Sequence, residues 1–568
     1  MLRGAQCPVA RAFFRPYSSK SAAASSAFPK IREDNFDHVV RSPYNVEVSD
    51  LNLSDFVWRN IRSYPEQPAL TCGLTGRTYK YKEARGSSFN LSVALLNVVG
   101  LRPGDVLGML MPNVPEFPLV FLGAASAGLV VTPANPLYTP EELARQFTDA
   151  NVRCIVTVAS LFDKVQETVE LMPGGAGPII VEGVPIYKDL LSLKALMMRQ
   201  LTRMDLKPER IDPDALVALP YSSGTTGVPK GVMLTHRNMV ASINQMDHPQ
   251  MIAYGQDGPQ ERGLSVIPFF HIYGLQGTLN MSLSRGYHVI TLPKFEPQSF
   301  SNAVRNYKPT MMALVPPLVK FMTQSPTVNA EDLQFLRLVT SGAAPLGKPH
   351  VEAFLRKINN PEFIFKEAYG LTETSCMATM MPNAYIPEKI GSCGLPAPLV
   401  EVKVIDKNGI SLPVGETGEL LMRGPNVMKG YLNNEKATRR ILSEDGWLMT
   451  GDLAYIDSDG FVFIVDRMKE LIKVKGLQVS PTELEEILIK MDGIADVAVV
   501  GVPDEIAGEL PKAYVVKKPG SNITEDEVCT FLEPHVANFK HLKGGVQFVN
   551  EIPKNAAGKV LRKNLKDL

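Results

Sequence analysis

The chain has 568 residues, more than one hydrophobic core usually supports, so two or more domains are expected. Its 59 basic residues balance 59 acidic ones without a long block of either sign, which argues against nucleic-acid or membrane-surface binding as the main role. The six cysteines form no C-x-x-C pair, which argues against a zinc site or a disulfide framework and favours a reducing compartment. The apolar run 119–131 is too short to span a bilayer and predicts a core helix.

The first 32 residues differ in composition from the rest of the chain. Basic residues alternate with Ser, Ala and Phe, and the first acidic residue is Glu33. This composition is typical of a transit peptide, and residues 15–19 (RPYSS) resemble a mitochondrial processing site. We therefore expect import into the mitochondrial matrix. The alternative is a disordered tail on a cytoplasmic or peroxisomal protein, although the last three residues (KDL) are not the Ser-Lys-Leu peroxisomal signal.

Apolar β-rich runs alternate with helical patterns up to about residue 466. A helix is predicted at 140–150, with Thr139 as its N-cap and Pro140 in its first turn. Strands are predicted at 152–158, 264–268, 287–292, 311–316, 336–340 and 362–366. This alternation predicts a layered α/β architecture with largely parallel sheets.

The pattern becomes shorter after residue 466. Helices are predicted at 481–491 and 524–532, and strands at 497–502 and 512–516. We therefore expect three parts in the chain: the N-terminal segment 1–32, a large domain of several subdomains over 33–468, and a small, mobile α+β domain over 469–568.

A loop rich in glycine and hydroxyl residues covers 221–231 (YSSGTTGVPKG), directly after the predicted strand 215–220. Backbone N–H groups, hydroxyls and a lysine are the groups that bind a triphosphate at the end of a strand. The loop is not a Walker A motif, because Pro229 precedes the lysine and Gly231 follows it. An ordinary surface turn is the alternative. The candidate phosphate-binding residues are Ser222, Ser223, Gly224, Thr225, Thr226, Gly227 and Lys230.

Polar side chains also follow other predicted strands and turns. His271 comes shortly after the strand 264–268, where a core histidine is the alternative. In the segment 367–373 (EAYGLTE), Tyr369 offers a flat face for adenine, Thr372 a hydroxyl, and Glu373 an oxygen ligand for Mg²⁺. Asp452 follows a glycine turn and suits the two hydroxyls of a ribose, with a turn cap as the alternative.

In this order the motifs resemble those of the acyl-adenylate-forming enzymes, which include acyl-CoA synthetases, 4-coumarate:CoA ligases, beetle luciferases and peptide-synthetase adenylation domains. The segments 341–347 (SGAAPLG), 466–470 (DRMKE), 473–478 (KVKGLQ) and 553–562 (PKNAAGKVLR) extend the resemblance, which covers about 53–566. The resemblance implies that a carboxylic acid reacts with ATP to give an acyl-AMP and pyrophosphate. Coenzyme A then forms the acyl-CoA thioester and releases AMP. Mg²⁺ is the implied cofactor.

The resemblance also implies roles for individual residues. Lys559, His271 and Lys230 would be catalytic: Lys559 as the cation of adenylation, His271 orienting the carboxylate. Lys475 and Gly476 would bind coenzyme A, and Lys469 would be the hinge. The implied nucleotide site adds Tyr369, Gly370, Thr372, Asp452 and Arg467. The implied acid pocket comprises Tyr273, Gly277, Ala343, Glu367, Ala368, Thr372, Met380, Lys469 and Lys473.

The acid itself is open between 4-coumarate and a medium- or long-chain fatty acid. Gly277 and Glu367 stand where the plant enzymes tend to carry Ser and Gln, and a carboxylate beside an anionic substrate is unfavourable. A luciferase-like monooxygenase that uses the same adenylation step is one alternative function, and a non-catalytic nucleotide-binding scaffold is another.

Overall fold

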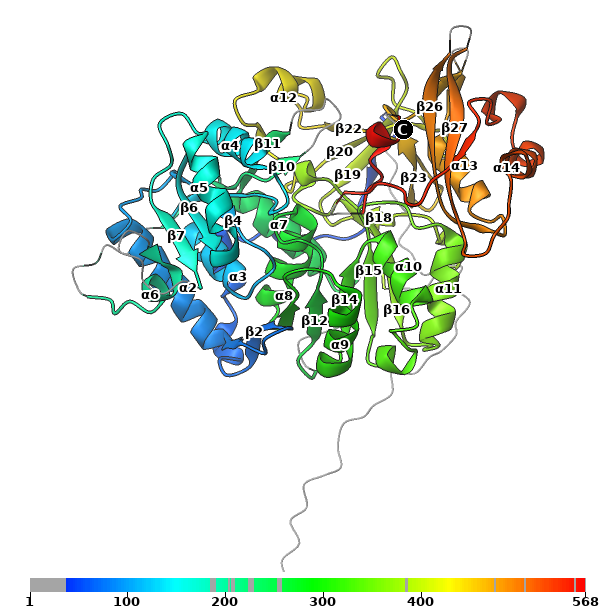
Figure 1. Ribbon diagram of the computed structural model, residues 1–568. Helices are drawn as coiled ribbons and strands as arrows, with labels where there is room; N and C mark the ends of the chain where they lie inside the picture. The colour runs from blue at the N-terminus through cyan, green and yellow to red at the C-terminus, as the bar shows by residue number, and fades with distance from the viewer. Residues whose placement is uncertain are drawn as a thin grey trace, which may run out of the picture. The chain divides into compact units, whose positions relative to one another are not determined.

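The computed structural model describes residues 37–183, 191–202, 205, 210–222, 229–252, 258–383, 387–474, 477–504, 507–555 and 558–566. Strands within these ranges form four sheets, and helices cover the faces of the two largest (Figure 1). The predicted α/β fold is confirmed, because both nine-stranded sheets have parallel cores.

The first nine-stranded sheet has the order β10-β11-β9-β5-β4-β6-β7-β8, with β21 paired to β11. The strands from β9 to β8 run parallel, whereas β11 is antiparallel to β9, β10 and β21. The strands are β4 (Val106–Leu110), β5 (Val130–Pro133), β6 (Val152–Val158), β7 (Ile179–Glu182), β8 (Leu191–Ser192), β9 (Leu216–Ala218), β10 (Tyr221–Ser222), β11 (Lys230–Thr235) and β21 (Gly430–Tyr431). The helices of this region are α1 (Leu53–Val57), α2 (Tyr81–Asn97), α3 (Glu116–Ser126), α4 (Pro140–Asp149), α5 (Phe162–Glu170), α6 (Leu193–Met197) and α7 (His236–Met246).

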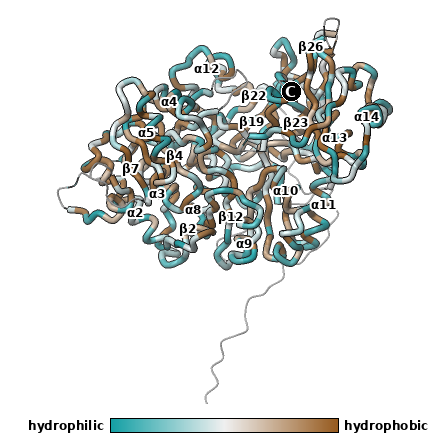
Figure 2. Tube along the Cα trace, in the orientation of Figure 1, coloured by the Kyte–Doolittle hydropathy of each residue, from teal (hydrophilic) through white to brown (hydrophobic). Residues whose placement is uncertain are grey.

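The second nine-stranded sheet has the order β18-β17-β16-β15-β14-β12-β13-β2-β3 and is parallel from β16 to β2. Its strands are β2 (Pro68–Cys72), β3 (Thr78–Lys80), β12 (Arg262–Ser265), β13 (His288–Thr291), β14 (Met311–Leu314), β15 (Leu338–Ser341), β16 (Ile364–Tyr369), β17 (Thr379–Met380) and β18 (Leu395–Pro396). Its helices are a π-helix (Tyr273–Asn280), α8 (Met281–Ser284), α9 (Pro297–Tyr307), α10 (Pro316–Gln324) and α11 (Lys348–Ile358). In Figure 2 hydrophobic stretches lie along strands of this sheet and of the other sheets.

Two five-stranded sheets follow. The third sheet consists of β1 (Val40–Arg41), β19 (Glu401–Ile405), β20 (Gly418–Arg423), β22 (Leu448–Ile456) and β23 (Val462–Arg467), with α12 (Glu435–Ile441) inserted before β22. The fourth consists of β25 (Leu477–Val479), β24 (Ile472–Val474), β27 (Gly508–Lys517), β26 (Ile494–Asp504) and β28 (Val546–Phe548). Helices α13 (Pro481–Leu488), α14 (Glu525–Leu532) and α15 (Arg562–Lys566) accompany the fourth sheet.

The described residues from 472 onward bury hydrophobic clusters of their own around β24, β26 and β27. The expected small α+β unit therefore has the sheet and core that it needs, although its boundary at Lys469 stays a prediction. Arg562 links this unit internally, since its guanidinium lies 2.8 Å from Glu470 and 2.5 Å from Glu485.

Local sequence signals explain several element boundaries. Thr139 and Thr524 cap α4 and α14, each within a capping box, as Thr-x-x-Glu spacing predicts. One prediction was wrong in part: the run 119–131 is not a continuous helix. Helix α3 ends at Ser126 and β5 begins at Val130, because Gly128 adopts a φ of 75° and turns the chain between them.

Candidate active site

A cavity of about 1120 Å³ is lined by residues of both nine-stranded sheets, the π-helix, α12 and the segment around Lys559. Many residues that were predicted from separate motifs therefore meet in one space. The predicted residues on its wall are Ser222, Lys230, His271, Tyr273, Gly277, Ala343, Ala368, Tyr369, Gly370, Thr372, Glu373, Met380, Arg467, Lys469 and Lys559.

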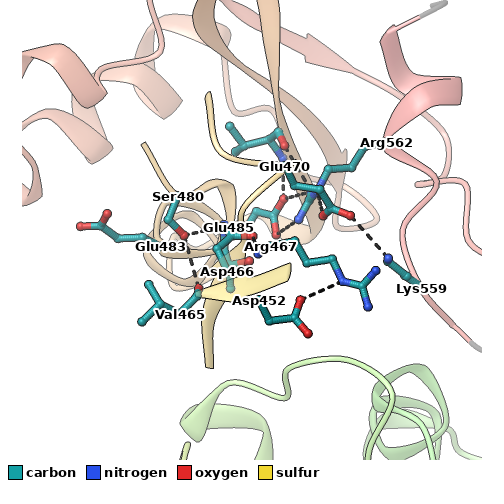
Figure 3. A network of polar contacts seen from close by, with 12 residues as sticks. Asp452, Val465, Asp466, Arg467, Glu470, Ser480, Glu483, Glu485, Lys559 and Arg562 are labelled. Atoms are coloured by element: carbon teal, nitrogen blue, oxygen red, sulfur yellow. Dashed lines mark hydrogen bonds and ion pairs between the residues drawn. The ribbon is translucent and has the colours of Figure 1, made fainter. Parts of the chain in front are cut away.

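Asp452 forms a polar link between the second and third sheets. The hydroxyl of Tyr369, at the end of β16, donates to Oδ2 of Asp452 at 2.5 Å. Nε of Arg467 lies 3.2 Å from Oδ1 of Asp452 (Figure 3). Asp452 and Arg467 face each other directly across β22 and β23. Burial raises the pKa of Asp452, and the positive charge of Arg467 opposes this rise. Tyr369 and Arg467 line the cavity while Asp452 lies behind them, so its direct contact with a ribose stays a prediction.

Lys559 reaches the cavity from the C-terminal part of the chain. Its Nζ lies 3.5 Å from Oε1 of Glu470, whose other oxygen pairs with Arg562 (Figure 3). Burial lowers the pKa of Lys559, as does the nearby Arg467, whereas Glu470 and Asp452 raise it. The ammonium is therefore partly removed from water and gains from an added anion.

Glu373 is held at the opposite wall by two hydroxyls. Its Oε1 accepts from Ser222 Oγ at 3.0 Å and from the Tyr431 hydroxyl at 2.7 Å. Neither bond uses Oε2. The ammonium of Lys230 lies 5.1 Å from the ring centre of Tyr431. Burial lowers the pKa of Lys230, the charge of Lys469 adds to this shift, and Glu373 opposes it.

The strand register explains why Ser222 and Lys230 lie together. β10 and β11 are antiparallel, and Ser222 pairs directly with Lys230. The two strands that flank residues 223–229 in the sequence are therefore antiparallel neighbours. Five of the predicted phosphate-binding residues, Ser223, Gly224, Thr225, Thr226 and Gly227, lie outside the described residues, as do Lys475 and Gly476.

The acid side of the cavity lies around the π-helix. Burial lowers the pKa of His271 to about 4, so its imidazole is neutral near pH 7. Its Nδ1 accepts the backbone N–H of Tyr273 at 3.2 Å, which leaves the proton on Nε2 as a donor. The Tyr273 hydroxyl donates to the carbonyl of Thr340 at 3.0 Å and fixes the ring against the second sheet.

Gly277 lies where the wall of the cavity is closely packed. A Cβ at this position would lie 2.9 Å from Cys376 Sγ and 2.9 Å from the Tyr273 ring. The missing side chain is already replaced by these neighbours, so glycine permits close packing of the wall and does not add depth.

Among the predicted site residues that the structure describes, three do not line the cavity: Glu367, Asp452 and Lys473. Oε2 of Glu367 accepts the backbone N–H of Gly391 at 3.2 Å, and its charge interacts with Glu486 of α13. Lys473 is exposed on β24, and its backbone N–H donates to Glu509. Glu367 and Lys473 are therefore not wall residues of the cavity, contrary to the prediction for the acid pocket.

Sequence reasoning did not assign roles to two residues that hold catalytic candidates in place. Tyr431 binds Glu373, and Glu470 pairs with Lys559. Glu470 lies within the quoted segment 466–470, next to the predicted hinge, so its position was a usable signal. Tyr431 has no comparable local signal, because its partner lies 58 residues away in the chain.

Comparisons with known proteins agree with this geometry. The model of the AMP-binding enzyme family matches residues 57–432, and that of the AMP-binding enzyme C-terminal domain matches residues 483–559. The chain belongs to the AMP-binding enzyme family.

Similar proteins include 4-coumarate–CoA ligase 3 of Oryza sativa subsp. japonica, 40% identical over 92% of this chain and 93% of the relative. 4-coumarate–CoA ligase 1 of Arabidopsis thaliana is 39% identical over 94% and 96%. Among solved structures, ATP-bound MatB from Rhodopseudomonas palustris superposes with a TM-score of 0.80 at 29% identity, covering 91% of this chain and 99% of MatB. This family member is an ATP-dependent, AMP-forming acid–CoA ligase that works through an acyl-AMP, as predicted.

Replacing Glu367 by Gln is expected to stabilise the protein above pH 7. Burial raises the pKa of Glu367 from 4.5 to about 7. A carboxyl whose pKa is higher in the folded state stabilises the fold below its unfolded pKa, and this contribution is lost as the pH rises through the folded pKa. Between pH 4.5 and about 7 the unmodified protein should lose of the order of 3 kcal/mol of unfolding free energy that E367Q retains.

Urea denaturation at several pH values measures this difference. Glu362→Gln, at an exposed position just before β16, is the matched control and should follow the unmodified protein. If the unfolding free energies of E367Q and the unmodified protein change with pH in parallel, ionisation of Glu367 does not destabilise the fold and the prediction is wrong.

Proposed function

We propose that this ligase activates carboxylic acids with a flexible apolar body, and that medium- or long-chain fatty acids are better substrates than 4-coumarate. The observation that carries the proposal is the number of methionines on the cavity wall. They are Met246, Met251, Met281, Met311, Met312, Met377, Met380 and Met449. Methionine is unbranched and adapts its shape, so such a wall can pack against a flexible chain.

The relatives named as 4-coumarate–CoA ligases support the phenolic acid as the second candidate. A bound phenol needs a hydrogen-bond partner, whose net contribution is about 1 kcal/mol. Each buried methylene contributes about 0.8 kcal/mol, so two additional carbons outweigh that bond. The balance favours the longer chain.

We assign the chemical roles as follows. The neutral His271 would donate from Nε2 to one oxygen of the substrate carboxylate and orient the other toward the α-phosphate of ATP. That oxygen forms a bond to phosphorus while the bond to the bridging oxygen breaks, and pyrophosphate leaves with the electron pair. Lys559 and Lys230 would offset the repulsion between the two anions at this step. Tyr369 would stack on adenine, with Arg467 and Asp452 beside the ribose.

Glu373 fits a Mg²⁺ site. Mg²⁺ in nucleotide sites is commonly held by one or two carboxylates together with phosphate oxygens, and Glu373 is fixed near Lys230 with Oε2 outside its two hydrogen bonds. When bound there, the ion would reduce the negative charge of the ATP phosphates. Tyr431 and Ser222 would keep the carboxylate in position.

Thioester formation would need a second arrangement of the C-terminal part, because coenzyme A must replace Lys559 at the acyl group. Lys469 is the proposed hinge, and Lys475 and Gly476 are the proposed coenzyme A contacts. The location of Lys469 on the cavity wall, close enough to lower the pKa of Lys230, supports a change at this residue during the cycle.

Replacing Lys559 by Ala should slow adenylation by at least about 100-fold, because one preorganised cation at the reacting phosphate is lost. Acid-dependent exchange of labelled pyrophosphate into ATP measures this step. Thioester formation from supplied acyl-AMP and coenzyme A should stay near the unmodified rate. Lys563→Ala, an exposed lysine on the same segment, is the control and should change neither rate. Equal losses in both half-reactions would contradict the assigned role.

A series of saturated acids from six to sixteen carbons should show kcat/KM rising by up to about fourfold per methylene until the cavity is filled. The best acid should exceed 4-coumarate. Met281→Phe, which replaces a pliable wall residue by a rigid ring, should move the optimum to a shorter chain. Met198→Leu, at a position that is 68% exposed, should not move it. A preference of the unmodified protein for 4-coumarate would refute the substrate assignment.

The basic, acid-poor segment before Glu33 supports import into the mitochondrial matrix, which we also propose. The mature protein should begin near Ser18 or Ser19. N-terminal sequencing of the protein from isolated mitochondria tests this, and retention of residues 1–15 in the active pool would count against it.

A further inference from the structure

Two basic side chains of helix α12 lie on the cavity wall, and the mechanism above gives them no role. Lys436 and Arg440 are four residues apart, hence on one face of the helix, and both line the cavity. Both side chains are exposed, and neither side chain has an ion pair or hydrogen bond among the described residues. Arg439, on a different face, pairs with Glu435 at 2.8 Å and does not line the cavity.

The helix is held firmly beside the Glu373 site. Asn434 caps it by accepting the backbone N–H of Ala437 at 3.0 Å. Thr438 accepts the backbone N–H of Tyr431 at 2.9 Å, and the hydroxyl of Tyr431 binds Glu373. α12 packs against β21 and β22 at the edge seen in Figure 1, and Figure 2 shows it as largely hydrophilic. Lys436 and Arg440 therefore stand on a scaffold tied to the nucleotide end of the cavity.

The charge of the cavity wall is strongly positive. Its described basic residues are Lys230, Lys436, Arg440, Arg467, Lys469 and Lys559, against the acidic residues Glu142, Glu373 and Glu419. Arg440 is near enough to Lys230 for its charge to act on it. Cations that repel one another across a cavity gain most from a compact ligand with several negative charges.

We propose that Lys436 and Arg440 bind the terminal phosphoryl groups of ATP and then the departing pyrophosphate. Arg440 lies on the Lys230 side, so the two α12 cations extend the positive wall beyond the reacting α-phosphate. They would hold the β- and γ-phosphoryl groups in ATP and keep pyrophosphate bound after the bond to the α-phosphate breaks. The inference rests on the proposed adenylation roles of Lys230 and Lys559, but it is independent of which acid is activated.

Calorimetric titration with magnesium pyrophosphate tests the site without any turnover. Lys436→Met and Arg440→Met should each weaken binding about three- to tenfold, and the double variant should weaken it further. Arg439→Met, on the same helix but paired away from the cavity, should bind like the unmodified protein. The affinity of the unmodified protein should also fall more steeply with salt than that of the double variant.

Kinetics then separate pyrophosphate from coenzyme A, which also contains a diphosphate. In acid-dependent pyrophosphate exchange, the KM for pyrophosphate and for ATP should rise in K436M and R440M by the same three- to tenfold, with R439M unchanged. If these variants bind pyrophosphate within twofold of the unmodified protein, or if the larger rise is in the KM for coenzyme A in thioester formation, the proposal is wrong. If the unmodified protein shows no exchange, the proposed adenylation roles of Lys230 and Lys559 are wrong. The calorimetric titration then tests the pyrophosphate site at Lys436 and Arg440 by itself.

Discussion

The constraint on which the rest of the structure depends is electrostatic: several positively charged side chains must line one cavity although they repel one another. A carboxylate can attack a phosphate only where positive charge offsets the repulsion between two anions. The cavity wall gathers basic residues from distant segments, and three of them lie near a carboxylate. Glu470 lies beside Lys559, Asp452 beside Arg467, and Glu373 close to Lys230.

The lowered pKa values of Lys230 and Lys559 show that the charged form of each lysine is destabilised in this arrangement. For both, burial is the largest cause and a neighbouring cation adds to it. A polyanion bound in the cavity would relieve both effects. The link from Tyr369 through Asp452 to Arg467 joins the second sheet to the third, so Tyr369, which we propose stacks on adenine, and Arg467 are fixed relative to each other.

The acid side follows a different principle. His271 is neutral, its tautomer is set by the backbone N–H of Tyr273, and the surrounding wall is rich in methionine. In the proposed binding mode, a rigid donor would fix the carboxylate end of the acid, and the apolar end would meet a surface that can adapt. This division separates the chemistry, which tolerates little movement, from acid selection, which tolerates more.

The sequence by itself determined the elements and the order of the motifs. The capping boxes at Thr139 and Thr524 and strands such as β6 follow from local patterns, because hydrogen-bond caps and apolar periodicity act over a few residues. The reaction class was implied by the order of the motifs, which resembles that of the acyl-adenylate-forming enzymes. Only the tertiary structure decided which side chains share the cavity. Glu367 turns to Gly391, Asp452 is covered by Tyr369 and Arg467, Tyr431 holds Glu373, and α12 presents Lys436 and Arg440. These contacts join residues far apart in the chain, and the direction of a side chain at the end of a strand is set by packing against such distant partners, which local patterns do not encode.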